Sequence, residues 1–257
     1  MSNSRGNNST TADIYTDIIF NSGTFKNVWE GLYTAGAREG QRCVAKEFKT
    51  GSVYEKSFFE EEMNVIRSTQ LIIDHFADSG VLGNGRGIIL NTPEIWTYDN
   101  TDAKVLIEPM IENYKKFNSN SGWASAPDSS SEAMQALSHF SYHDSNRQLL
   151  LCDLQGGIYQ DDFILSDPMI MSQTQEYGPS DLGIDGINSF FIRHRCGFFC
   201  SRQWKKPTIT GPAVIPMRQG SSMISSQSSS LFTRNPLAIT HHLPAHRRPL
   251  PLSRLRE

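Results

Sequence analysis

The sequence predicts an α+β fold in which residues 14–204 form one folded domain. The chain has 257 residues, which is long enough to bury a sizeable apolar core. Three β-rich runs stand at the front of the chain, and segments with the hydrophobic periodicity of helices follow them. Hydrophobic residues make up only 38% of the composition, so we expect part of the length to lie outside the packed domain.

The first elements are strands that we expect to form an antiparallel lobe. Residues 1–13 are rich in Ser, Asn and Thr and predict a disordered leader, because nothing in them could offset the entropy of ordering. The β-rich runs occupy Ile14–Phe20, Val28–Tyr33 and Arg42–Phe48. A glycine-bearing turn at 21–24 separates the first two runs.

A long amphipathic helix is predicted over Tyr54–Phe76. Its apolar residues recur at steps of three, four and seven, with acidic and basic residues between them. These apolar residues are Phe59, Met63, Ile66, Ile73 and Phe76. A glycine-rich loop within 80–87 ends the helix, and its spacing is wrong for a dinucleotide fingerprint. Strands resume at Ile95–Tyr98 and Ala103–Glu108.

The second half of the domain mixes helices with a buried strand. A helix is expected from about Ser131 to Tyr142, after a polar loop and a Ser-rich stretch. Leu149–Leu154 is apolar apart from its aspartate, the pattern of a buried strand. A short helix is expected over Asp185–His194.

The C-terminal residues 205–257 predict a disordered basic tail rich in Ser and Pro. From Arg202 to Glu257 the net charge is +8, whereas the preceding residues carry a net charge of −11. We expect this tail to be either a solvated linker or a docking arm that attracts an acidic surface at low salt.

Composition excludes several classes of protein. The overall net charge of −3 does not suggest a nucleic-acid-binding or membrane-surface protein. There is no apolar run long enough to cross a bilayer and no secretory signal, so we expect a cytoplasmic location, with the nucleus also compatible. Four cysteines in a chain of this length do not form a disulfide framework, so we expect thiols or metal ligands.

An oxygen-rich site is predicted at the end of the buried strand. Asp153 and Gln155 lie two residues apart, and Asp167 arrives from a nearby loop. Hard oxygen ligands of this kind suit Mg²⁺. Taken alone, an aspartate at a strand end also fits a turn former or a helix cap.

Lys46 lies in an apolar strand, where its charge must reach solvent, a partner or a ligand. The alternatives are a snorkelling lysine and a phosphate clamp whose ammonium is held by Glu61 or Glu62. Gly23, between two strands, could let the backbone approach phosphates closely.

A metal site is predicted around His194, Cys196 and Cys200, because imidazole and thiolate ligands at this spacing fit tetrahedral zinc. Spacing leaves the fourth ligand open among Cys152, His139 and His143, and buried thiols beside a surface histidine would be the alternative without metal. A closed site with four protein ligands would be structural.

Together these segments resemble the α-kinase family of atypical protein kinases, which includes the myosin heavy chain kinases and elongation factor 2 kinase. The matching motifs, in chain order, are Val44-Ala45-Lys46, Leu106-Ile107-Glu108-Pro109, Lys116-Phe117-Asn118-Ser119-Asn120-Ser121-Gly122, Leu137-Ser138-His139-Phe140-Ser141-Tyr142, Asp153-Leu154-Gln155-Gly156, Ser166-Asp167-Pro168, Gly178-Pro179-Ser180-Asp181-Leu182-Gly183, and His194-Arg195-Cys196 with Cys200. The resemblance covers nearly all of 14–204 and implies a bilobal atypical protein-kinase-like fold. Its N-lobe would be an antiparallel sheet and its C-lobe would be stabilised by zinc.

The resemblance implies a protein serine/threonine kinase that uses ATP and Mg²⁺. It implies catalysis by Asp153 and Mg²⁺ binding by Gln155 and Asp167. Lys46 would contact the phosphates, with Glu62 as its partner, and Glu108 and the Met110 backbone would recognise adenine. Asn118 and Asn120 would lie near the active site. Positioning and charge neutralisation supply most phosphoryl-transfer catalysis, so these groups would suffice.

The resemblance also implies a peptide-substrate loop and a complete set of zinc ligands. The loop would contain Gly178, Asp181 and Gly183. For structural zinc it selects His139, His194, Cys196 and Cys200, which leaves Cys152 as a packed thiol.

One departure from the family concerns the connection from Asp153 to Asp167, which is longer than usual and could displace Asp167 or bulge outward. The alternatives to an active kinase are an inactive kinase fold that binds nucleotide or scaffolds partners, and a zinc-stabilised binding domain. The protein substrate and the oligomeric state are not readable from the motifs.

Overall fold

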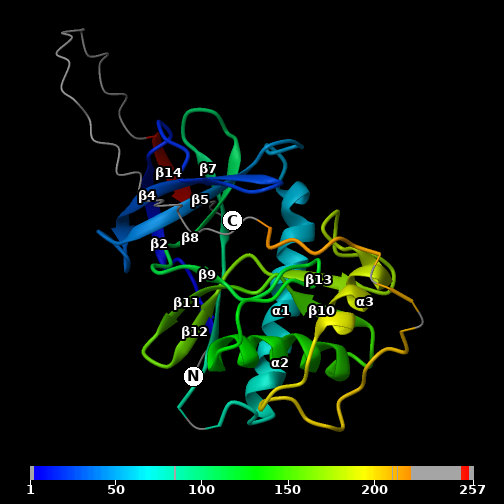
Figure 1. Ribbon diagram of the computed structural model, residues 1–257. Helices are drawn as coiled ribbons and strands as arrows, with labels where there is room; N and C mark the ends of the chain where they lie inside the picture. The colour runs from blue at the N-terminus through cyan, green and yellow to red at the C-terminus, as the bar shows by residue number, and fades with distance from the viewer. Residues whose placement is uncertain (1–2, 84, 210, 213, 221–249, 255–257) are drawn as a thin grey trace, which may run out of the picture.

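The computed structural model describes residues 3–83, 85–209, 211–212, 214–220 and 250–254. It has two lobes, an upper one built on a β-sheet and a lower one that holds the three α-helices (Figure 1). The predicted α+β class and bilobal arrangement are therefore confirmed.

The N-lobe is a seven-stranded sheet in the order β2-β14-β7-β8-β5-β4-β3. Its strands are β2 (Ser9–Ile14), β3 (Asn21–Ser22), β4 (Lys26–Gly36), β5 (Arg42–Phe48), β7 (Glu94–Tyr98), β8 (Lys104–Pro109) and β14 (Leu250–Arg254). All neighbours pair antiparallel, as the sequence predicts for this lobe. Because β2 also pairs with β4, the pairings run from β2 through β14, β7, β8, β5 and β4 back to β2, and the sheet closes on itself.

The C-lobe contains a five-stranded sheet in the order β1-β6-β12-β11-β9 and a separate pair, β10-β13. The strands are β1 (Ser4–Arg5), β6 (Ile88–Asn91), β9 (Lys115–Lys116), β10 (Leu149–Cys152), β11 (Gln155–Tyr159), β12 (Asp162–Leu165) and β13 (Met169–Ser172). The helices are η1 (Lys56–Phe59), α1 (Glu60–Asp78), α2 (Ser129–Asp144) and α3 (Gly183–Arg193). None of the helices in the described ranges is long and apolar enough to span a bilayer.

The helices form where the sequence supplies caps and an apolar face. Three glutamates occupy the first turn of α1, where negative charge complements the helix dipole. Asp128 caps α2 by accepting a hydrogen bond from the Ser131 backbone N–H at 2.7 Å. The side chains that α1 buries are Val65, Ile66, Thr69, Ile72, Ile73 and Phe76.

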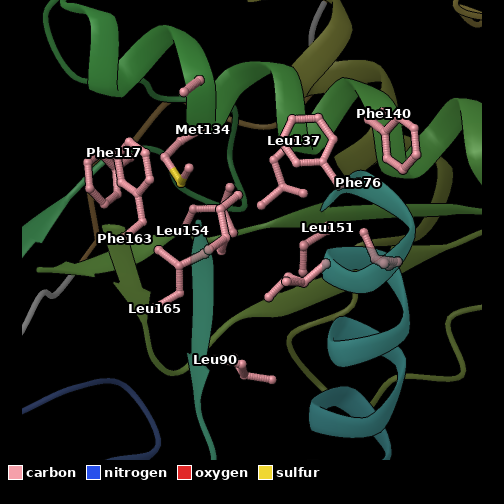
Figure 2. Close-up of a cluster of buried hydrophobic side chains, with 14 of the residues drawn as sticks. Phe76, Leu90, Phe117, Met134, Leu137, Phe140, Leu151, Leu154, Phe163 and Leu165 are labelled. Atoms are coloured by element: carbon pink, nitrogen blue, oxygen red, sulfur yellow. The ribbon is translucent and has the colours of Figure 1, made fainter. Parts of the chain in front are cut away.

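The main hydrophobic core lies between α1, α2 and the C-lobe strands. Figure 2 shows Met134, Leu137 and Phe140 of α2 facing this core, with Phe76 of α1 beside them. Phe76 and Phe140 meet edge to face at 5.1 Å between ring centroids. This packing fixes α2 and β10, the elements that carry His139 and lead into Asp153.

The leader prediction is wrong for residues 3–13, which form β1 and β2. Asn7 is fully buried; its Nδ2 donates to the Ile107 carbonyl at 2.8 Å, and its Oδ1 accepts from the Tyr33 hydroxyl. Composition misled the prediction because pairing to the sheet satisfies polar residues that cannot build a core of their own. The first strand is also misplaced, since β2 ends at Ile14 and Ile18 is 79% exposed.

The tail prediction is wrong for the described residues beyond 204. Residues 211–212 and 214–220 have no regular structure, yet the backbone of this stretch hydrogen-bonds to the C-lobe. Leu250–Arg254 forms β14. The Ser-rich stretch 221–230 lies outside the described residues.

Candidate functional site

A cleft of about 410 Å³ lies where the two lobes meet. The β3–β4 turn with Gly23 and strand β5 line it from the N-lobe. The C-lobe contributes the start of α1, the ends of β10 and β12, and the loop 177–180. Lys46, Asp153, Gln155 and Asp167 all line this cleft, so the residues that the motifs singled out are brought together.

Asp153 directly follows β10 and is 5% exposed. Its Oδ1 lies 2.9 Å from Lys116 Nζ, its Oδ2 accepts from Gln155 Nε2 at 2.8 Å, and the Asn120 backbone N–H donates to the same carboxyl. Burial raises the pKa of Asp153 to about 6, although the Lys116 ammonium favours the ionised form. The sequence does not reveal that Lys116 pairs with Asp153, because spacing does not show which carboxylate a lysine reaches.

The long connection from Asp153 to Asp167 bulges outward as the β11–β12 hairpin. Tyr159 pairs with Asp162 at its tip, and the Ser166 backbone N–H donates to the Gln155 carbonyl at 3.0 Å at its base. The hairpin thus returns Asp167 to the cleft beside Gln155, whose Nε2 lies 3.3 Å from the Asp167 carbonyl. A carboxylate and an amide oxygen beside each other fit Mg²⁺.

Both aspartates have left-handed backbones, with φ of 58° at Asp153 and 55° at Asp167. Aspartate tolerates this region better than most residues, but the conformation is still uncommon. The pairing on either side of each residue holds it there, which turns both carboxyl groups toward one place.

Lys46 on β5 is 2% exposed. Its Nζ lies 3.0 Å from Glu108 Oε1, 2.8 Å from Ser166 Oγ and 3.6 Å from Asp167 Oδ1. Against the effect of burial, the carboxylates of Asp167 and Glu108 raise the pKa of Lys46, so the side chain stays charged. The snorkelling alternative is wrong, because the ammonium is held inside the protein.

Glu62 does not hold Lys46, which corrects the predicted pairing. The Glu62 carboxylate binds Lys26 Nζ at 2.6 Å, and the same ammonium lies 2.9 Å from Asp167 Oδ1. Glu61 lines the cleft beside it. The sequence did not point to Lys26, because a single lysine after a turn carries no motif. In the sheet Lys26 lies opposite Phe48, two residues from Lys46 along β5, so that Lys26 and Lys46 share one face.

Two cations therefore face one carboxylate. Burial opposes the ionisation of Asp167, but Lys26 and Lys46 outweigh it and hold the pKa of this carboxyl well below its usual value. The two ammonium groups and the carboxylates of Asp167 and Asp153 form a charged set that can bind an anion through the lysines and a cation through the oxygens.

The predicted adenine-reading groups lie elsewhere. Glu108 is fully buried and is occupied by Lys46 and by Ser166 Oγ, which donates to it at 2.6 Å. The Met110 backbone N–H donates to the Arg42 carbonyl at 3.1 Å, and its carbonyl accepts from Arg5 at 3.4 Å. Neither residue is among those that line the cleft, and recognition of adenine by Glu108 and Met110 stays a prediction. Arg5 belongs to the segment expected to be disordered, and for that reason the sequence could not reveal its contact.

Asn118 and Asn120 lie next to the residues that follow β10, and neither is among the residues that line the cleft. Asn118 is fully buried, where its Oδ1 accepts from the Leu154 N–H at 2.9 Å and its Nδ2 donates to Ser138 Oγ at 3.0 Å. It ties the end of β10 to α2. The Asn120 backbone N–H donates to Asp153, and a role of Asn118 and Asn120 beside an active site stays a prediction.

The loop predicted to meet the peptide substrate, 178–183, reaches the cleft through its first residues. Gly178 has φ +81°, and a Cβ there would lie 2.9 Å from Glu61 Oε2. Asp181 is buried and accepts hydrogen bonds from the backbone N–H groups of Ser172 and Gly183 at 3.0 and 2.9 Å. Asp181 therefore shapes the loop from inside, and Gly183 begins α3.

A cluster of nitrogen and sulfur ligands joins α2 to the segment after α3. The ligand atoms of His139, His194, Cys196 and Cys200 all lie within 4.8 Å of one another. Cys196 Sγ lies 3.6 Å from His139 Nδ1, and Cys200 Sγ lies 3.6 Å from His194 Nε2. With usual bond lengths, a tetrahedral zinc holds sulfur and nitrogen ligands about 3.6 Å apart, so the donor set fits zinc.

The surroundings of the cluster also suit a metal. The His139 Nε2–H donates to the Lys205 carbonyl at 3.1 Å, which leaves Nδ1 for an ion. Burial lowers the pKa of His139 to about 4 and that of His194 to about 3, so both rings are neutral at pH 7. Cys152 is buried, and burial raises the pKa of its thiol well above its usual value, as expected for a packed cysteine.

Comparisons with known proteins agree with this geometry. Residues 21–200 match the sequence model of the Alpha-kinase family. Among curated proteins of Dictyostelium discoideum, the chain is 38% identical to Alpha-protein kinase vwkA over 98 residues, which are 37% of this chain and 16% of that protein. It is 40% identical to Myosin heavy chain kinase C over 102 residues, or 39% of this chain and 12% of that protein. The aligned part thus spans less than a fifth of either relative.

The fold is similar to a solved α-kinase domain. The crystal structure of the inactive α-kinase domain of myosin heavy chain kinase A in complex with ATP superimposes with a TM-score of 0.59. The identity is 18%, and the match covers 74% of this chain and 87% of that one. Because the family match runs through both lobes and includes the cleft residues, the chain belongs to the α-kinase family.

Proposed function

We propose that this chain is an atypical protein kinase that transfers the γ-phosphate of ATP to a serine or threonine hydroxyl of a protein. The observation that carries the proposal is the convergence of Asp153, Gln155, Asp167, the buried Lys46 and the partly buried Lys26 on one cleft. Relatives named as protein kinases and a solved relative that binds ATP support it.

Asp153 is the group that orients the substrate hydroxyl and accepts its proton. It is the buried carboxylate with an elevated pKa; Lys116 holds its Oδ1 and Gln155 Nε2 donates to its Oδ2. A pKa near 6 leaves it mostly ionised at pH 7, when it can accept a proton. Positioned charge of this kind supplies much of the catalysis in phosphoryl transfer.

Lys26 and Lys46 bind phosphate oxygens of the nucleotide, with Gly23 in the turn above them. Asp167 and Gln155 would hold Mg²⁺, which supplies positive charge against the phosphates when bound. In this structure Lys26 and Lys46 form ion pairs with Asp167. When nucleotide and Mg²⁺ bind, the phosphates would become the partners of the lysines and Mg²⁺ would become the partner of Asp167.

The cluster of His139, His194, Cys196 and Cys200 would bind a structural zinc ion. All four positions are filled by protein ligands, so no site remains for a reacting water. Zinc would connect α2 to the chain after α3 and thus stabilise the C-lobe.

Transfer of radiolabelled phosphate from ATP, with Mg²⁺ present, tests the proposal. We expect the parent chain to label a generic basic protein or itself, and Asp153→Asn to lose at least about 100-fold in rate. Asp161→Asn, at the hairpin tip, is the matched control and should keep the parent rate.

The competing function is an inactive kinase fold that binds nucleotide or scaffolds partners. It predicts no labelling by any variant, while ATP still raises the melting temperature of the parent chain. Equal labelling by Asp153→Asn and the parent would remove Asp153 from the chemistry.

A further inference from the structure

The chain following the proposed zinc ligands passes beside Lys116, the lysine that holds Asp153. In Figure 1 this segment, in orange, runs from beside α3 toward the centre of the molecule. A Cβ atom at Gly220 would lie 3.2 Å from Lys116 Nζ, the group that is 2.9 Å from Asp153 Oδ1. The segment therefore ends its described course next to the group proposed to accept the substrate proton.

The segment is held through its main chain. The hydroxyls of Ser119 and Ser121 donate to the Arg218 carbonyl at 2.6 and 2.8 Å, and the Arg218 N–H donates to Ser121 Oγ at 2.7 Å. Arg193 of α3 donates to the Ile215 carbonyl at 3.3 Å. By contrast, the side chains of residues 216–220 are exposed, Met217 at 55%.

The protein side of this contact is a built surface, which we call the serine cradle: Ser119, Ser121 and Arg193. Ser119 and Ser121 are 1% and 4% exposed, and their hydroxyls lie 3.0 Å apart. Arg193 is fixed by its hydrogen bond to Ser189 Oγ at 2.6 Å. Asn120, between the two serines, donates its N–H to Asp153, so the cradle is rigidly connected to the catalytic carboxylate.

We propose that the serine cradle is the docking groove for the main chain of the protein substrate, and that residues 215–220 of this chain occupy it as an intramolecular competitor. The inference rests on the proposed kinase function and adds to it the way in which substrate is bound. A groove that binds carbonyl and N–H groups accepts an extended peptide whatever its side chains are. A peptide on the same path delivers the residues after the cradle to Asp153.

An intramolecular occupant weakens the binding of an external peptide, because the free groove is only a fraction of the population. The probe is a fluorescein-labelled peptide with the sequence of residues 211–220, measured by anisotropy without nucleotide on the full chain. Arg218→Pro removes the N–H that donates to Ser121 Oγ, whereas Arg218→Ala keeps this N–H as well as the carbonyl that accepts from Ser119 and Ser121. We expect Arg218→Pro to bind the peptide at least about tenfold more tightly than the parent or Arg218→Ala.

A second variant confirms the location. Adding Ser121→Ala to Arg218→Pro should reverse the gain in peptide affinity, with the melting temperature checked to show that the chain remains folded. Equal peptide binding by Arg218→Pro and Arg218→Ala, or no binding by any variant, would overturn the proposal.

Kinetics connect the groove to substrate. Arg218→Pro should lower the KM for a protein substrate and leave the KM for ATP unchanged. If the peptide binds as expected and no variant transfers phosphate, the proposed kinase function fails and the peptide groove stands. An active enzyme whose substrate KM is the same in Arg218→Pro and Arg218→Ala would show that substrate docks elsewhere.

Discussion

At the scale of single residues, the cleft depends on how two carboxylates share three ammonium groups. Asp153 is held by one lysine and Asp167 by two, and all three ammonium groups are largely buried. Leaving a buried charge unpaired costs several kcal/mol, so each of these groups requires the others. The same pairing gives the two carboxyls different pKa values: that of Asp153 is raised and that of Asp167 is lowered.

The elevated pKa of Asp153 predicts a pH dependence of activity. Because the neutral carboxyl cannot accept a proton, kcat/KM should fall about tenfold per pH unit below pH 6 and level off above it. Asp167, whose pKa is lowered, stays ionised over this range and should not contribute. A profile of kcat/KM from pH 5 to 8 measures this, and a flat profile would contradict the role of Asp153.

Lys26 should be as important for nucleotide binding as Lys46. Replacing Lys26 by Met removes one of the two cations beside Asp167, and we expect kcat/KM for ATP to fall by at least about tenfold. Lys56→Met, an exposed lysine on η1, is the control and should have no effect. An unchanged KM and kcat in Lys26→Met would assign Lys26 a purely structural pairing with Glu62.

At the scale of elements, predictability follows the length and pattern of each segment. The strands over 42–48 and 94–98 and the long helix were readable, because apolar periodicity persists over several residues. The strands between 155 and 172 were missed; the first of them begins Gln-Gly-Gly, which is not a β-rich pattern. Their pairing partners, which lie elsewhere in the sheet, decide their structure.

The same limit applies within the site. Lys46, Asp153 and the four residues of the proposed zinc site stand in motifs, which is why the sequence singled them out. Whether Glu62 holds Lys46 or Lys26 depends on the register of β4 against β5 and on the position of α1. The sequence pattern shows neither the strand register nor the position of the helix.

The metal cluster predicts a difference between two cysteines. Cys196→Ser should lower the zinc content from one ion per chain to near zero and reduce the melting temperature, because the link from α2 to the segment after α3 is lost. Cys152→Ser also alters a cysteine of the C-lobe, but it should keep one zinc per chain. Elemental analysis of both purified variants checks this, and full zinc in Cys196→Ser would show that another residue ligates.

At the scale of the whole molecule, the last described residues pair with β2, a strand near the start of the chain. β14 lies between β2 and β7, with Ser253 in register with Thr11 on one side and Thr97 on the other. The closed ring leaves neither β2 nor β7 as an open edge. The lobe that carries Lys26 and Lys46 is thus completed by the last described residues.

Removing one backbone donor from β14 tests this closure. Ser253→Pro loses an N–H from the ladder, and we expect at least about 1 kcal/mol of lost stability together with faster amide exchange in β2 and β7. Ser253→Ala keeps the N–H and should exchange like the parent. Identical protection of Thr11 and Thr97 in both variants would show that β14 does not pair there.

The position of β14 has a consequence for how the protein is made. A ribosome releases β2, β7 and the other strands of the ring long before residues 250–254, so the nascent N-lobe waits with two unpaired edges. Pairing across such a long stretch of sequence is slow, because the loop must close before any contact is gained. The N-lobe would therefore finish folding only after residues 250–254 have left the ribosome, and a chain stopped before these residues would offer those edges to other nascent chains.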